Sequence, residues 1–203
     1  MSKLPKLNSE YYADITRQIR SGITNISDLT KEKNTLDRMI KSGDYAGQKL
    51  HDLNEKLSNV RIKLSQERKD QQRKVKAMCD EFAEELRKED DLNPADIVDG
   101  DLRLLTCGIA LTNRDLEAMI ARNKTNATMS QLILRYCREN GRKDIELGYI
   151  YQGNDDLIRN VNLIPELCRT VLRYDDGMEG GAGHIYNEIL GEGSELAEIF
   201  SDD

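Results

Sequence analysis

Apolar residues in the first third of the chain recur at steps of three, four or seven. They are Ile15, Ile19, Ile26, Leu29, Leu36 and Ile40, followed after a polar stretch by Leu50, Leu53, Leu57, Val60 and Leu64. This spacing is typical of a coiled-coil seam, with Gly22 and Lys33 at two intervening seam positions. Gly43 suits the end of the first helix and Asp44 the start of the second, so the two helices should fold back on each other. We predict a long antiparallel coiled-coil hairpin in residues 1–91.

The second helix of this hairpin is expected to be longer than the first. No Gly or Pro occurs between Gly47 and Pro94, which allows one helix of about 45 residues. The apolar pattern skips from Leu64 to Val75 and then continues. A gap of this kind is a stutter, which shifts the seam without ending the helix.

Shorter helical patterns follow and predict a compact helical domain in residues 92–174. Asn93 and Pro94 are typical of the cap and first turn of a helix. Residues 145–152 alternate like a strand, and Pro165 is expected to break the helix that contains it. The fold class that we predict is nevertheless all-α.

Two of these helices have the outline of a helix-turn-helix. Thr112 and Asp115 form a capping-box pattern at the start of one, and the other begins near Ala127 and ends before Gly141. A DNA-reading helix presents polar and basic side chains near its start, whereas the arginines of this helix come at its end. We therefore favour packing over DNA binding for this segment.

Residues 175–203 are expected to be a glycine-rich hinge followed by an acidic C-terminal segment. Acidic residues alternate there with apolar ones at helical spacing, which suits docking into a groove of a partner protein. The predicted partner-binding residues are Glu188, Glu192, Glu195, Glu198, Leu196, Ile199 and Phe200. The alternative, given equal weight, is that the segment caps the fold of its own chain.

Charge is distributed unevenly along the chain. Lys and Arg outnumber Asp and Glu by two in residues 1–91 and by two in residues 92–143, whereas residues 144–203 have a net charge of −11. A basic band on the second long helix consists of Arg61, Lys63, Arg68, Lys69, Arg73, Lys74 and Lys76. Its lack of interleaved aromatic residues disfavours nucleic acid, so we read it as a solvated helix face or a docking strip for an acidic partner, including the acidic end of this protein.

The composition contains no signature of catalysis. The four cysteines lie about thirty residues apart with no C-x-x-C pair, and the chain has only two histidines, so neither a metal site nor a nucleophile–base arrangement is predicted. We expect no enzyme activity and no cofactor. The absence of a long apolar run and of an apolar stretch after the N-terminus predicts no membrane span and no secretory signal.

One resemblance adds to this interpretation. The charged hairpin, followed by residues 111–119 (LTNRDLEAM) and 126–132 (NATMSQL), resembles small helical proteins encoded in the head-assembly gene clusters of tailed bacteriophages, over residues 10–140. The resemblance implies a scaffold or minor virion component in capsid assembly, located in the cytoplasm of the bacterial host or in the virion. We expect a protein partner, either a capsid protein or a host protein, and self-association through the coiled coil.

Two other functions are left open by the sequence. A phage-encoded acidic helical protein could inhibit a host defence complex, as anti-CRISPR proteins do, with its acidic region in a site made for phosphates. The helix-turn-helix outline could instead belong to a nucleic-acid-binding regulator. Our leading hypothesis is a non-catalytic protein that binds another protein.

Overall fold

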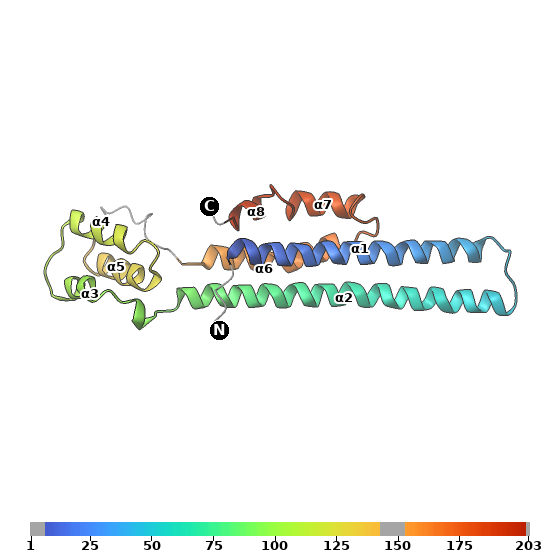
Figure 1. Ribbon diagram of the computed structural model, residues 1–203, viewed down its shortest axis with the longest axis horizontal. Helices are drawn as coiled ribbons and strands as arrows, with labels where there is room; N and C mark the ends of the chain where they lie inside the picture. The colour runs from blue at the N-terminus through green and yellow to red at the C-terminus, as the bar shows by residue number, and fades with distance from the viewer. Residues whose placement is uncertain (1–6, 143–152, 202–203) are drawn as a thin grey trace. The chain divides into compact units, whose positions relative to one another are not determined.

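A computed structural model describes residues 7–142 and 153–201, and every regular element in these ranges is helical (Figure 1). The elements are α1 (Asn8–Lys41), α2 (Gln48–Asp90), the 3-10 turn η1 (Pro94–Asp96), α3 (Asp99–Thr106), α4 (Asn113–Arg122), α5 (Ala127–Glu139), α6 (Asp155–Val171), α7 (Gly181–Ile189) and α8 (Glu195–Ile199). The all-α fold class is therefore confirmed. The predicted strand at 145–152 lies outside the described residues. Across the described ranges, no helix is both long enough and apolar enough to span a membrane.

The chain divides into two compact units. The first, called here the long-helix unit, contains the residues up to Ala83 and those from Arg159 onward, and the short-helix unit contains Glu84–Ile158. This division differs from the three consecutive segments expected from the sequence, because the end of the chain belongs with its beginning.

Helices α1 and α2 of the long-helix unit run antiparallel to each other. Their cross-helix contacts pair rising numbers on α1 with falling numbers on α2, from the stacked rings of Tyr11 and Phe82, 4.7 Å apart, to the ion pair of Asp37 with Arg61. Glycine occupies left-handed conformations in the connection, with a φ of 76° at Gly43 and 58° at Gly47. The two helices lie side by side within one chain (Figure 1).

Most of the predicted seam is buried within this chain. Ile15, Ile19, Ile26, Leu36, Leu53, Leu57, Val60 and Leu64 are at most 9% exposed, whereas Leu29, Ile40 and Leu50 are half-buried. In the longer α2, apolar burial continues beyond the stutter at Val75, Cys79 and Phe82. The seam is thus covered by the chain itself, and any self-association has to use the outer faces of the helices.

The end of the chain packs on the same two helices. Arg68 of α2 donates a hydrogen bond to the carbonyl of Leu172, just after α6, at 3.1 Å. Tyr12 of α1 donates one to the carbonyl of Leu190, just after α7, at 3.0 Å. These contacts join residues more than 100 positions apart in the sequence, so α6, α7 and α8 form an additional layer over part of α1 and α2.

Helix α6 continues through Pro165, so the expected break at this residue is wrong. Proline removes one backbone donor and clashes with the preceding turn, which costs about 3 kcal/mol in an isolated helix. Val161, Ile164, Cys168 and Val171 are all fully buried on either side of it. Burial of this apolar face offsets the cost and keeps both turns in one helix.

The short-helix unit is built around α3, α4 and α5. Its core consists of Leu111, Leu116, Met119, Ile120, Ile133 and Cys137. The predicted capping box is confirmed, because the Thr112 hydroxyl accepts from the Asp115 amide and the Asp115 carboxylate accepts from the Thr112 amide. The buried carboxylate of Asp101 on α3 accepts hydrogen bonds from Arg122 and Asn123 at the end of α4, each at 2.7 Å. The capping box thus fixes the start of α4, and the buried Asp101 carboxylate holds α3 against the end of α4.

Candidate functional site

The predicted glycine hinge is a closely packed turn in this structure. The carboxylate of Asp176 accepts hydrogen bonds from the amides of Gly181 and Ala182, at 2.6 and 2.9 Å, and so caps the start of α7. The same two bonds, with the Ala182 bond first, lower the pKa of Asp176 below its ordinary value. A Cβ atom on Gly183 would lie 1.8 Å from the carbonyl oxygen of Met178, so only glycine fits there. The glycines in this segment therefore allow the backbone of the turn to pack closely against the start of α7.

Aromatic rings fix the end of the acidic segment to its own chain. Phe200, only 1% exposed, stacks on Tyr12 with the ring centroids 5.1 Å apart and tilts against Phe82 at 5.6 Å. Tyr186 of α7 is also buried, with the guanidinium of Arg20 5.4 Å above its ring. Both phenylalanines of the protein are thus in this cluster, which we call the aromatic cluster: Tyr11, Tyr12, Phe82 and Phe200.

The predicted partner-binding residues separate into two groups in this arrangement. Phe200 is used inside the protein, and Leu196 is half-buried. Ile199 is 38% exposed, and all four glutamates face solvent, namely Glu188, Glu192, Glu195 and Glu198. Residues 174–203 contain nine Asp and Glu and no Lys or Arg. The exposed glutamates, which we call the acidic surface, are held by a folded support instead of a loose tail.

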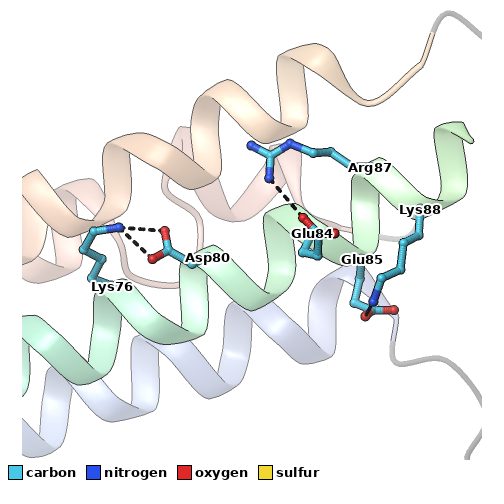
Figure 2. Close-up of polar contacts among 6 residues, drawn as sticks. All are labelled: Lys76, Asp80, Glu84, Glu85, Arg87 and Lys88. Atoms are coloured by element: carbon cyan, nitrogen blue, oxygen red, sulfur yellow. Dashed lines mark hydrogen bonds and ion pairs between the residues drawn. The ribbon is translucent and has the colours of Figure 1, made fainter.

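Four members of the predicted basic band form ion pairs with carboxylates of the same chain. Arg73 pairs with Asp70 at 2.8 Å and Lys76 with Asp80 at 2.6 Å, both within α2. Figure 2 shows the Lys76 pair, followed along the same helix by Glu84 with Arg87 and Glu85 with Lys88. Pairs three or four positions apart on an exposed helix contribute only a few tenths of a kcal/mol each. This part of the band behaves as the solvated helix face that the sequence allowed.

Arg61 and Arg68 of the band reach other elements instead. Arg61 pairs with Asp37 of α1 at 3.4 Å, and Arg68 pairs with Asp175 after α6. The second pair is a direct contact between the basic band and the acidic C-terminal part of the chain. Lys63, Lys69 and Lys74 are exposed.

A polar cluster fills the stutter of the seam, and the sequence pattern did not identify it. Gln71 is 2% exposed and packs against Gly22, where a Cβ atom would lie 3.0 Å from its side chain. Its amide oxygen accepts from Gln18 at 2.5 Å, and its amide nitrogen donates to Glu67 at 2.7 Å. Asn25 donates to the same Glu67 oxygen at 2.8 Å. These two bonds, the one from Gln71 first, lower the pKa of Glu67.

This cluster sets the register of α1 against α2. A buried amide that finds its partners only at one alignment disfavours every shifted alignment. The available signal was Gly22 at a seam position opposite an eleven-residue gap in the apolar pattern.

The helix-turn-helix outline is present as α4 and α5, but its polar groups are used within the unit. Near the start of α5, the Thr128 hydroxyl accepts from the Asn93 amide at 2.9 Å and the Ser130 hydroxyl donates to the Asn123 carbonyl at 3.2 Å. Both side chains are buried. A recognition helix needs this first turn exposed, so the arrangement supports packing.

Three of the four cysteines are buried, and the described ranges contain no cluster of metal-binding side chains. Burial raises the pKa of the thiols of Cys79 and Cys168 to about 12, which keeps them protonated and poorly nucleophilic. Within residues 7–142 and 153–201 there is no group of three or more His, Cys, Asp or Glu that could hold a metal ion. Both histidines are exposed.

Comparison with known proteins gives no relative for this chain: no protein-family model matches it, and neither does any curated protein or any solved structure.

Proposed function

We propose that this chain is a non-catalytic protein that binds another protein through the acidic surface on α7 and α8. The observation that carries the proposal is that apolar and acidic side chains of the last 30 residues lie on opposite sides of the segment. Apolar anchors such as Phe200 face inward while the four glutamates face outward. A surface that is already ordered loses little conformational entropy when a partner binds, and its charge speeds association with a basic partner.

The biological setting that we propose is assembly of a bacteriophage head, with the protein as a scaffold or minor virion component. The proposal rests on the sequence resemblance to head-cluster proteins. In this role α1 and α2 act as a coiled-coil hairpin that spaces or extends the protein, and the acidic surface contacts the shell protein. A helix of 43 residues such as α2 is about 65 Å long, which suits a spacer.

The test is binding of the full chain to the shell protein encoded with it, followed by sedimentation velocity. The variant Glu188→Gln/Glu192→Gln/Glu195→Gln/Glu198→Gln removes four charges and leaves the shape nearly unchanged. We expect it to bind at least about tenfold more weakly, with less dependence on salt. A matched control carries Gln at four exposed glutamates elsewhere, Glu32, Glu55, Glu81 and Glu117. Equal binding by both variants would remove the acidic surface from the interface.

A second candidate is inhibition of a host defence complex of the anti-CRISPR type. The supporting observation is that the exposed glutamates stand in a segment without any Lys or Arg, as a mimic of a phosphate chain requires. In that case the full chain should compete with nucleic acid for binding to a guide-RNA effector complex, and it should not bind the shell protein. The third possibility, a nucleic-acid-binding regulator, is less well supported because the start of α5 is buried.

A further inference from the structure

A shallow groove crosses the middle of α1 and α2. Its volume is about 590 Å³, and its charged lining consists of Lys33 and Asp37 from α1, Arg61, Arg68 and Lys69 from α2, and Asp175 from the turn after α6. All these residues belong to the long-helix unit. The groove therefore combines members of the basic band with the lysine that interrupts the apolar seam.

Cations are in excess in this groove. Asp37 is engaged by Arg61 and Asp175 by Arg68. Among the described residues, no carboxylate forms an ion pair with Lys33 or Lys69, which leaves a net charge of +2. Lys33 is also half-buried, and it stands at a seam position where an apolar side chain would pack better. A site of this kind favours an anionic occupant.

The acidic surface of the same molecule lies too far away to fill the groove. Its support is anchored to α1 at Tyr12 and Thr16, through bonds with Leu190 and Tyr186. From Thr16 to Lys33 the helix rises 1.5 Å per residue, or roughly 25 Å. Reaching the groove would require the aromatic cluster to come apart.

We propose that the acidic surface of a second copy of this chain docks in the groove. Charge complementarity supports this occupant, because one surface carries four exposed glutamates and the other an excess of two cations. Groove and acidic surface are different parts of the molecule, so each copy can bind one neighbour at each. Such a head-to-tail contact builds open chains instead of closed dimers. The inference deepens the proposed function and rests on it for the role of the acidic surface.

The experiment uses the full chain and two variants that neutralise one side of the contact each. Lys33→Gln/Lys69→Gln changes the groove, and Glu195→Gln/Glu198→Gln changes the acidic surface. Lys49→Gln/Lys56→Gln removes two exposed charges near the start of α2, outside the groove, and serves as control. Sedimentation velocity is measured over a range of protein concentrations at low and at high salt, with circular dichroism to check helix content.

The expected pattern is specific. The wild-type chain and the control form species that grow with concentration and dissociate in high salt, whereas each variant alone associates at least about tenfold more weakly. A mixture of the two variants forms one-to-one dimers and nothing larger, because one intact groove meets one intact acidic surface. A monomeric wild-type chain at low salt, a dimer that does not grow, or a groove variant that associates like the wild type would each overturn the inference.

A second readout separates this inference from the proposed function. Lys33→Gln/Lys69→Gln should bind the shell protein as the wild type does, since it retains the acidic surface. A wild-type chain that binds the shell protein but does not self-associate would disprove the groove contact and leave the proposed function standing. Self-association without shell binding would do the reverse.

Discussion

The two halves of the α1–α2 pair share one apolar period but differ in what covers them. In the covered half, residues 12–27 and 68–83, the four isoleucines that α1 has in this range are at most 2% exposed. In the bare half, residues 31–41 and 48–64, Leu36 and Leu53 are 9% exposed and Ile40 is half-buried. The end of the chain packs on the covered half, where Leu190 and Phe200 both contact Tyr12. The period of a pattern thus shows which face is buried, and the number of covering helices decides how much that burial stabilises.

The largest expected effect is at the aromatic cluster. Phe82→Ala removes a fully buried ring that stacks on Tyr11 and contacts Phe200, so we expect a loss of about 3–5 kcal/mol in the free energy of unfolding. Tyr45→Ala, at a half-buried ring next to the bare half, is expected to cost less than about 1 kcal/mol. Urea unfolding measures both. Equal losses would show that the covered half has no special weight.

A matched pair of isoleucines on α1 tests the comparison directly. Ile19→Ala should cost about 3 kcal/mol because it leaves a cavity at a fully buried site. Ile40→Ala removes the same atoms from a half-buried site near the end of the helix, and about 1 kcal/mol is expected. The ratio of the two losses, obtained from the same urea curves, is the critical quantity, and a ratio near one contradicts the structure.

Removing part of the cover should have an intermediate effect. Gly183→Ala places a methyl group against the Met178 carbonyl and displaces the start of α7, at an expected cost of about 2 kcal/mol. Gly100→Ala, at a helical position with open space around its Cβ, should be neutral or slightly stabilising. Thermal unfolding distinguishes the two variants, and a harmless Gly183→Ala would mean that the turn has room to move.

The smallest effect concerns pH at the polar cluster between the two halves. The pKa of Glu67 is lowered in the folded protein, so its hydrogen bonds stabilise the fold fully above the ordinary value of 4.5. That contribution is lost as the pH falls below 4.5 and through the folded pKa. Because Glu67 is only half-buried and solvent still screens its charge, we expect less than about 0.5 kcal/mol. The urea midpoint of unfolding is measured from pH 6 to pH 3 for the wild type and for Glu67→Gln. The midpoint should fall slightly less with decreasing pH in the variant, and an equal fall in both proteins would argue against the bonds from Gln71 and Asn25.

Features set by nearby residues were predictable from the sequence. The period of α1 and α2 and the capping box at Thr112 depend on spacings of a few residues. The position of the connection was also predicted, but α2 begins at Gln48 and not at Asp44 as expected. The four glutamates were predicted as partner-binding residues, and all four are exposed, since acidic side chains are costly to bury. The coiled-coil geometry of the hairpin stays a prediction.

Features set by distant residues were not predictable in the same way. Pro165 was expected to break α6 because its local cost is visible, whereas the packing that offsets it comes from other helices. Gly177 was read as flexible because its close neighbour Ser27 is 150 positions away in the sequence. The contact of Gly183 with Met178 is local, but the glycine-rich composition gave no sign of it. The groove could not be predicted either, because its lining residues Lys33 and Asp175 lie far apart in the sequence. The sequence pattern of one chain shows which face of a helix is apolar, but it does not show which distant segment packs on that face.

The cysteines have a practical consequence for following assembly in solution. Cys79, Cys137 and Cys168 are buried, and the first and last have thiol pKa values raised to about 12, whereas Cys107 at the end of α3 is exposed. A maleimide dye or a spin label should therefore react first at Cys107. This residue lies in the short-helix unit, while the groove and the acidic surface both belong to the long-helix unit. The natural chain thus offers one site for a reporter that leaves both charged surfaces unmodified.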